Sequence, residues 1–162
     1  MKFTHRAEYP AAPEAVFAVM SDPAFQDAKC AATTTGTWQA DVSTSGDRTR
    51  ITTERILPTD GLPDIARSFV GDSLTVVEIQ TWSPPSVDGS RVADLNLHVK
   101  GAPMTLKGTI RLSPTAAGSV QEVDADLRAG VPLIGGRLEK AAAEPLLVAA
   151  RTETRLLHAR VG

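Results

Sequence analysis

The chain has 162 residues, 42% hydrophobic and 22% charged, so it is long enough to bury a core as one domain, residues 1–162, without disulfides or metals. Its formal net charge of -2 at pH 7 excludes an electrostatic case for binding nucleic acid. Its single cysteine, Cys30, excludes an internal disulfide framework and any paired-cysteine metal or redox motif. Because no stretch reaches roughly 18 apolar residues and no secretion signal is evident, we expect a cytoplasmic protein without integral membrane association.

The first part of the chain predicts one strand and two short helices. Residues 2–9 alternate between polar and apolar side chains, which is typical of a half-buried strand. Pro13 suits the first turn of a helix over residues 13–20. Ser21-Asp22-Pro23 then ends that helix and caps a second one over residues 24–31.

From Gly36 onward the sequence predicts six strands separated by turn residues. The first two form a hairpin across Ser45-Gly46-Asp47, and residues 62–70 form a short helical or irregular insertion. The six expected strands are residues 37–43, 48–57, 73–82, 91–100, 104–112 and 120–128.

The last part of the chain predicts a long helix over residues 133–158, which at about 1.5 Å per residue spans roughly 35–40 Å. Pro145 removes a hydrogen bond to Ala141, so we expect a kink there. A stripe that can face the sheet comprises Ile134, Leu138, Ala142, Pro145, Ala149 and Leu156.

This order of elements predicts a cavity, because a seven-stranded antiparallel sheet bends and one helix cannot fill its concave side. The strand faces expected to point inward mix apolar with small or mildly polar side chains: Trp38, Ala40, Val42, Ile51, Thr53, Val77, Ile79, Thr81, Met104, Leu106 and Ile110. The long helix adds Ala141, Ala142, Ala143, Ala149 and Ala150, where a solid core would favour larger residues. The alternative is that the alanines only let helix and sheet approach closely.

Three segments carry a resemblance over essentially the whole chain: residues 1–5, residues 13–17 and Val131-Pro132-Leu133-Ile134-Gly135-Gly136-Arg137-Leu138-Glu139. With these segments the chain resembles the START-like (polyketide cyclase-like, SRPBCC) helix-grip superfamily, and within it the actinobacterial domain of unknown function family 2505. The resemblance implies an α+β helix-grip fold, a seven-stranded curved antiparallel sheet around a long C-terminal helix, with a ligand cavity between them. It implies no particular substrate.

The sequence contains no catalytic motif in the structural context that its chemistry requires. Gly71-Asp72-Ser73-Leu74 matches the short sequence motif of a hydrolase family. The nucleophilic serine of such a motif should stand at the start of a helix, whereas here a strand is expected to begin at Ser73. The three histidines His5, His98 and His158 are isolated, which argues against a zinc site. No phosphate-binding glycine loop is present, so we expect no nucleotide cofactor.

Two polar residues are nevertheless candidates for the pocket. His5 shares strand parity with Phe3, Ala7 and Tyr9 and would face inward, either as a ligand partner or general base or satisfied by backbone. Arg55 shares parity with Ile51 and Thr53, and would anchor a carboxylate head group or pair with Glu78. We assign the other charged strand residues and His98 to the solvent face: Arg91, Lys100, Lys107, Arg111, Glu122, Asp124 and Asp126.

We therefore expect a non-catalytic protein, without cofactor or metal, that binds or carries a hydrophobic small molecule or lipid, with the long helix and residues 62–71 as a lid. The alternatives are a small cyclase- or dehydratase-type enzyme using His5 or Tyr9 with a pocket carboxylate, and a protein-interaction scaffold whose cavity is vestigial. The expected ligand-binding residues are His5, Tyr9, Trp38, Ile51, Thr53, Arg55, Ile79, Met104, Leu106, Leu138, Ala142, Pro145 and Ala149.

Overall fold

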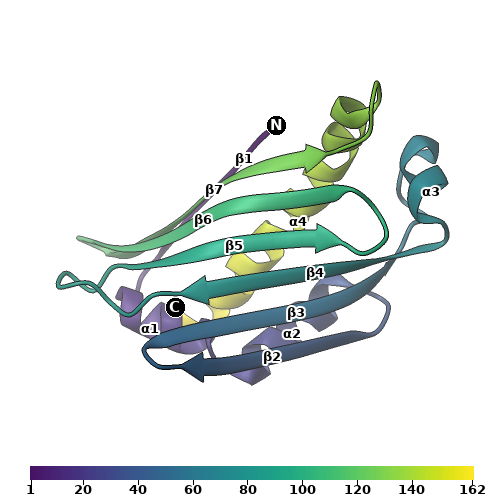
Figure 1. Cartoon of the computed structure of the whole chain (residues 1–162). Coiled ribbons are helices and arrows are strands. Elements are labelled where there is room, and N and C mark those ends of the chain that lie inside the picture. Colours follow the sequence, from purple (N-terminus) through teal and green to yellow (C-terminus); the bar gives the residue numbers. More distant parts are fainter.

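A computed structural model describes residues 1–162 as a seven-stranded sheet with four helices (Figure 1). The strands are β1 (Lys2–Tyr9), β2 (Trp38–Ser45), β3 (Arg48–Pro58), β4 (Ser73–Trp82), β5 (Arg91–Val99), β6 (Met104–Thr115) and β7 (Gly118–Ala129). The helices are α1 (Pro13–Met20), α2 (Pro23–Thr33), α3 (Asp64–Val70) and α4 (Gly135–Val161). Every element expected from the sequence is present, with ends that shift by a few residues.

The sheet is an antiparallel meander to which the N-terminal strand is added at one edge. Its strand order is β1-β7-β6-β5-β4-β3-β2, so each strand from β2 to β7 pairs with its neighbour in sequence. Strand β1 pairs with β7, with His5 opposite Val123 and Ala7 opposite Gln121. Strand β1 is therefore an edge strand of the sheet, and its partner is more than 100 residues away in sequence.

Particular residues explain where helices α1 and α2 begin and where the β2–β3 hairpin turns. Pro13 occupies the first turn of α1, and the Asp22 side chain accepts a hydrogen bond of 2.9 Å from the Ala24 N–H at the start of α2. Gly46 adopts a φ of 63° in the β2–β3 hairpin, a conformation that glycine reaches without steric cost.

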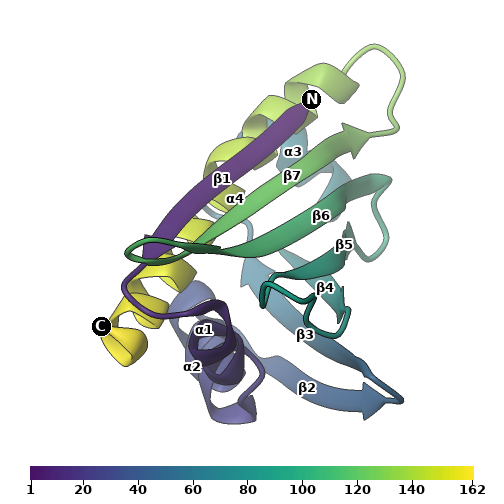
Figure 2. The same cartoon turned by 90° about the vertical axis from the view of Figure 1, so that its left-hand side faces the viewer.

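Helices α1, α2 and α4 lie on the concave side of the curved sheet, with α4 crossing it diagonally (Figures 1 and 2). Helix α4 packs against β1, β7, α1 and α2, and α2 packs against β2 and β3. The largest fully buried apolar side chains are Trp82, Phe25, Met20, Ile51, Leu112, Leu127 and Leu157. The core therefore lies where sheet, α1, α2 and the C-terminal half of α4 meet.

The expected orientation is wrong for four strand residues. On β4, Glu78 and Gln80 share the inner face with the buried Trp82, so Val77, Ile79 and Thr81 point to the convex face. The sequence pattern did not predict the inner face of β4, because Val76 and Val77 are both apolar and interrupt the alternation of apolar and polar residues. Arg91 also lies on the inner side, where its guanidinium sits 3.9 Å from the Phe17 ring centroid.

Helix α4 runs through Pro145, whose ring is exposed to solvent rather than facing the sheet. The stripe that meets the rest of the protein instead runs through Leu138, Ala142, Leu146, Ala149, Glu153 and Leu157. Its steps of three and four residues are helical, and Pro145 lies at the exposed edge of this stripe. None of the helices combines the length and apolarity needed to cross a lipid bilayer.

Candidate functional site

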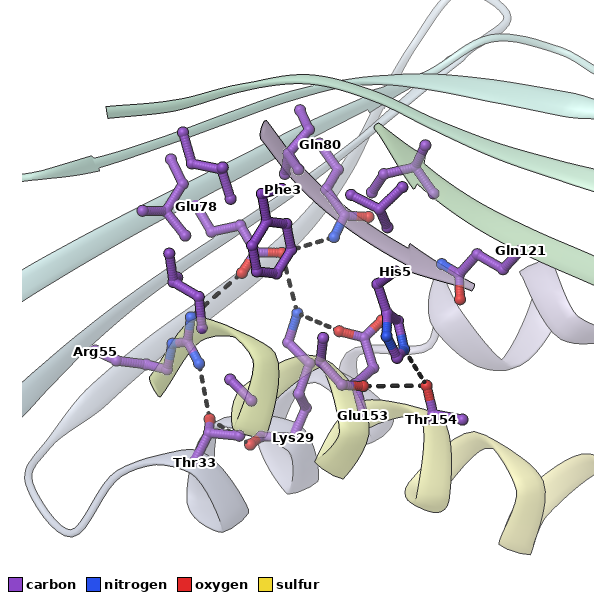
Figure 3. A pocket seen from close by; sticks show the side chains of 18 residues that line it. Phe3, His5, Lys29, Thr33, Arg55, Glu78, Gln80, Gln121, Glu153 and Thr154 are labelled. Carbon is purple, nitrogen blue, oxygen red and sulfur yellow. Dashed lines mark hydrogen bonds and ion pairs between the residues drawn. The ribbon is translucent and has the colours of Figure 1, made fainter. Parts of the chain in front are cut away.

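A cavity of about 80 Å³ lies between the concave face of the sheet and α4. It is lined by 18 residues from α2, α4 and every strand except β2, nine of them hydrophobic (Figure 3). The hydrophobic lining comprises Phe3, Leu95, Leu97, Leu106, Ile110, Val123, Leu146, Ala149 and Ala150. The remaining nine residues are polar or charged, so the cavity is amphipathic.

The charged lining side chains form one connected cluster, which we call the charged cluster: Lys29, Arg55, Glu78 and Glu153. The Lys29 ammonium lies 3.3 Å from Glu78 Oε1 and 3.2 Å from Glu153 Oε2. The Arg55 guanidinium lies 3.2 Å from Glu78 Oε2, so of the two roles expected for Arg55 the structure shows the pairing with Glu78. The cluster joins α2, β3, β4 and α4, and its two positive and two negative charges cancel.

Neutral hydrogen-bonding groups extend this cluster. Gln80 Nε2 donates to Glu78 Oε1 over 2.7 Å, while Gln80 Oε1 accepts from the Trp82 indole N–H over 2.9 Å. Arg55 Nη1 donates to Thr33 Oγ1 over 2.8 Å. Arg55 Nε, by contrast, is fully buried and has no partner.

Burial and pairing act in opposite directions on the charges of the cluster. Burial by itself raises the pKa of Glu78, but the positive charges of Lys29 and Arg55 outweigh it and lower that pKa to about 2. Burial lowers the pKa of Lys29, yet the Glu153 and Glu78 carboxylates produce a net rise. Both groups are therefore ionised at neutral pH, although the Lys29 side chain is only 2% exposed.

A second polar group lines the cavity beside β1 and β7. His5 Nε2 lies 3.0 Å from Thr154 Oγ1, and the Thr154 hydroxyl donates its proton to the Ala150 carbonyl over 3.0 Å. Burial, the largest cause, lowers the pKa of His5. Gln121, on the neighbouring strand, accepts a hydrogen bond of 3.2 Å from the Tyr9 hydroxyl.

Four of the residues expected to bind ligand line the cavity: His5, Arg55, Leu106 and Ala149. Their strand and helix parity brings them to the concave side from β1, β3, β6 and α4. They are the part of the expected site that the structure gathers at one place.

The other nine expected residues do not line the cavity. Tyr9 is buried beyond it, its ring 5.0 Å from that of His158, and Trp38 is exposed on the edge strand β2. Ile79 points to the convex face and Pro145 to solvent. The others occupy core or half-buried positions outside the cavity: Ile51, Thr53, Met104, Leu138 and Ala142. Residues 62–71, expected as part of a lid, also contribute nothing to the lining.

Sequence reasoning missed Lys29, Glu153, Gln80 and Gln121. Lys29 and Thr33 follow Phe25 at helical steps of four residues, on the buried face of α2. A lysine at a core position of an amphipathic helix signals a buried charge that requires partners. Glu153 gives the matching signal on α4, between Ala149 and Leu157.

No other constellation of catalytic or metal-binding residues emerges. Ser73 begins β4 and is exposed, which confirms the expected reading of that motif as a turn entering a strand. No group of three or more His, Cys, Asp or Glu side chains comes together as a metal site.

The family model described as "Protein of unknown function (DUF2505)" matches residues 4–161. No functionally curated protein matches the sequence.

Several solved structures share the fold. A STAR-related lipid transfer protein from Xanthomonas axonopodis superposes with a TM-score of 0.62 at 14% identity, over 99% of this chain and 85% of that one. The Zhui aromatase/cyclase from Streptomyces sp. R1128 gives 0.56 at 14% identity, over 99% and 93%. A START superfamily protein from Mycobacterium smegmatis gives 0.52 at 16% identity, over 99% and 96%. At these identities the likeness concerns the fold, which is the expected START-like helix grip.

The charged cluster predicts unequal effects for two lysines. Lys29→Met leaves Glu153 buried without a cation, so we expect a loss of about 3–5 kcal/mol in the free energy of unfolding. The matched control is Lys2→Met, since Lys2 pairs with Asp124 at 2.9 Å with side chains 67% and 65% exposed. We expect the control to lose far less stability, because solvent screens an exposed ion pair. Urea denaturation followed by circular dichroism measures both, and similar losses would contradict a stabilising role for the cluster.

The depressed pKa of Glu78 predicts a specific acid sensitivity. Because its pKa falls from 4.5 to about 2 on folding, the stability it contributes is complete above pH 4.5 and is lost as the pH falls toward 2. Glu78→Gln should lower stability at neutral pH and flatten its decline between these pH values. Denaturation midpoints measured across this range provide the test, with the exposed Glu122→Gln as control. An unchanged slope in Glu78→Gln would contradict the assignment.

Proposed function

We propose that this chain, which belongs to the DUF2505 family, binds or carries a hydrophobic small molecule or lipid between its sheet and α4. The observation that carries the proposal is the amphipathic cavity, whose apolar side chains come from β1, β5, β6, β7 and α4. Hydrophobic ligands are held by such linings, with a few polar groups that fix their orientation.

The cavity has more room than the one water that a vestigial scaffold would leave, but less than a lipid needs. A single water needs roughly 10–15 Å³, whereas the cavity measures about 80 Å³. It is smaller than the roughly 150 Å³ that admits benzene in an engineered protein core. A lipid would therefore require α4 to move outward, and only Leu138 and Leu157 of its 27 residues are fully buried.

Among the proteins with similar folds, one is a lipid transfer protein and another an aromatase/cyclase. Both names are consistent with hydrophobic molecules as ligands. They support a binding role for this chain without identifying its ligand, since one fold hosts many functions.

Native purification followed by organic extraction and mass spectrometry tests the proposal. We expect a hydrophobic molecule to co-purify at a ratio approaching one per chain, because water is a poor competitor for the apolar lining. The control is the Leu106→Arg variant, which places a charge in the cavity and should yield much less of that molecule. Repeated empty extracts from folded wild-type protein would count against a carrier.

A cyclase- or dehydratase-type activity is the second candidate, and the position of His5 favours it. This histidine lines the cavity and its pKa is lowered by burial, so a neutral imidazole is available as a general base at neutral pH. Tyr9, the other expected base, lies outside the cavity, and burial raises its pKa to about 12.

If His5 is the base, His5→Ala should reduce turnover of a hydrophobic cyclisation or dehydration substrate by about 100-fold or more, with a smaller change in KM. Turnover is followed by chromatography and mass spectrometry on the ligand that co-purifies. His98→Ala, on the convex face, is the matched control. Turnover that survives His5→Ala would remove the proposed base.

A further inference from the structure

We propose that the ligand of this cavity is an uncharged molecule whose polar end is a hydroxyl, an alcohol or phenol, held between His5 and Gln121. This inference rests on the proposed binding function and adds the chemical class of the ligand. It is carried by the charge balance of the lining and by two hydrogen-bonding atoms that the protein leaves unused.

The charged cluster offers no free charge to a ligand. Each of its cations is already paired, Lys29 with two carboxylates and Arg55 with Glu78, and the four charges sum to zero. A ligand carboxylate would add an uncompensated negative charge close to Glu78 and Glu153. Burying such a charge costs several kcal/mol in proteins, so the cluster disfavours fatty acids and other carboxylates.

His5 supplies an unused acceptor. With the Thr154 hydroxyl proton directed to the Ala150 carbonyl, we assign Thr154 Oγ1 as the acceptor of a hydrogen bond from His5, which places the imidazole proton on Nε2. In the neutral ring Nδ1 then carries a lone pair, and no protein group donates to it. It is not among the four fully buried unpartnered side-chain atoms, so it stays open to a small molecule.

Gln121 supplies an unused donor. Its side-chain oxygen accepts from the Tyr9 hydroxyl, which leaves the amide nitrogen without a protein partner. The residue is only 6% exposed, yet that nitrogen too is absent from the fully buried unpartnered atoms. The nitrogen is therefore accessible, and a ligand or water in the cavity can accept its hydrogen bonds.

The two side chains lie next to each other on the concave face of the sheet. His5 pairs with Val123, two residues from Gln121 on β7, so the two side chains are diagonal neighbours on the concave face (Figure 3). Diagonal Cα positions of this kind are roughly 7–8 Å apart. A hydroxyl donates one hydrogen bond and accepts others, so it matches a bare imidazole nitrogen and a free amide N–H together. An ether or ketone satisfies only Gln121.

Three probes of similar size test this assignment: 4-propylphenol, 4-propylbenzoate and propylbenzene. Their dissociation constants for the full-length wild-type protein at pH 7 are measured by NMR titration of the Trp82 indole signal and by calorimetry. We expect the phenol to bind about 10-fold more tightly than either of the others, since two hydrogen bonds distinguish it.

The variants His5→Phe and Gln121→Met should each reduce the preference for the phenol over propylbenzene by about fivefold. Their matched controls, His98→Phe on the convex face and Gln39→Met on the exposed edge strand, should leave it unchanged. Thermal unfolding shows which variants fold, and the wild-type preference is decisive even if one does not.

Each contrary outcome points to a different failure. If the benzoate binds as tightly as the phenol, or propylbenzene binds equally well, the hydroxyl assignment is overturned while hydrophobic binding stands. If none of the three probes binds while native extraction still yields a bound hydrophobic molecule, the hydroxyl assignment fails and the binding function stands; if the extract is also empty, both fail.

Discussion

The arrangement of this protein depends on the two ion pairs that the buried Lys29 ammonium makes. The Lys29 side chain leaves α2, reaches the space beneath the sheet, and contacts one carboxylate on β4 and another on α4. A buried lysine is unfavourable by itself, and only the convergence of both glutamates keeps it charged. The same contacts therefore position α4 over the sheet and set the polar character of the cavity they enclose.

The rest of the helix-sheet interface is comparatively sparse. Most of the face that α4 turns toward the sheet consists of alanines and half-buried leucines, and the cavity remains where larger side chains would have met. Apart from the ion pair between Glu153 and Lys29, α4 is held mainly by Leu138 and Leu157 toward its ends, so few apolar contacts oppose an outward shift. A hydrophobic ligand would restore those contacts, which links the packing defect to binding.

The polar lining divides into a part whose charges are balanced and a part with hydrogen-bonding atoms open to the cavity. The charged cluster has matched its charges within the protein, whereas His5 and Gln121 each retain one free hydrogen-bonding atom. Polar groups that line a cavity usually find a hydrogen-bond partner in the protein, in water or in a ligand, so these two free atoms on adjacent strands offer a ligand specific contacts. The balanced charges and the free hydrogen-bonding atoms restrict the chemical class of the proposed ligand more than the fold does.

The sequence by itself determined the order of elements, the concave placement of His5, Arg55 and Leu106, and the alanine face of α4, because these follow from local periodicity and turn residues. The sequence did not indicate that Lys29 or Glu153 lies at the site, and its pattern predicted the wrong inward-facing residues on β4. Those features depend on which side chains meet across distant elements, and a lysine on α2 becomes a site residue only when β4 and α4 bring carboxylates to it. Tertiary structure alone decided the charge balance of the cavity, because pairing of buried charges is a property of contacts between segments rather than of any one segment.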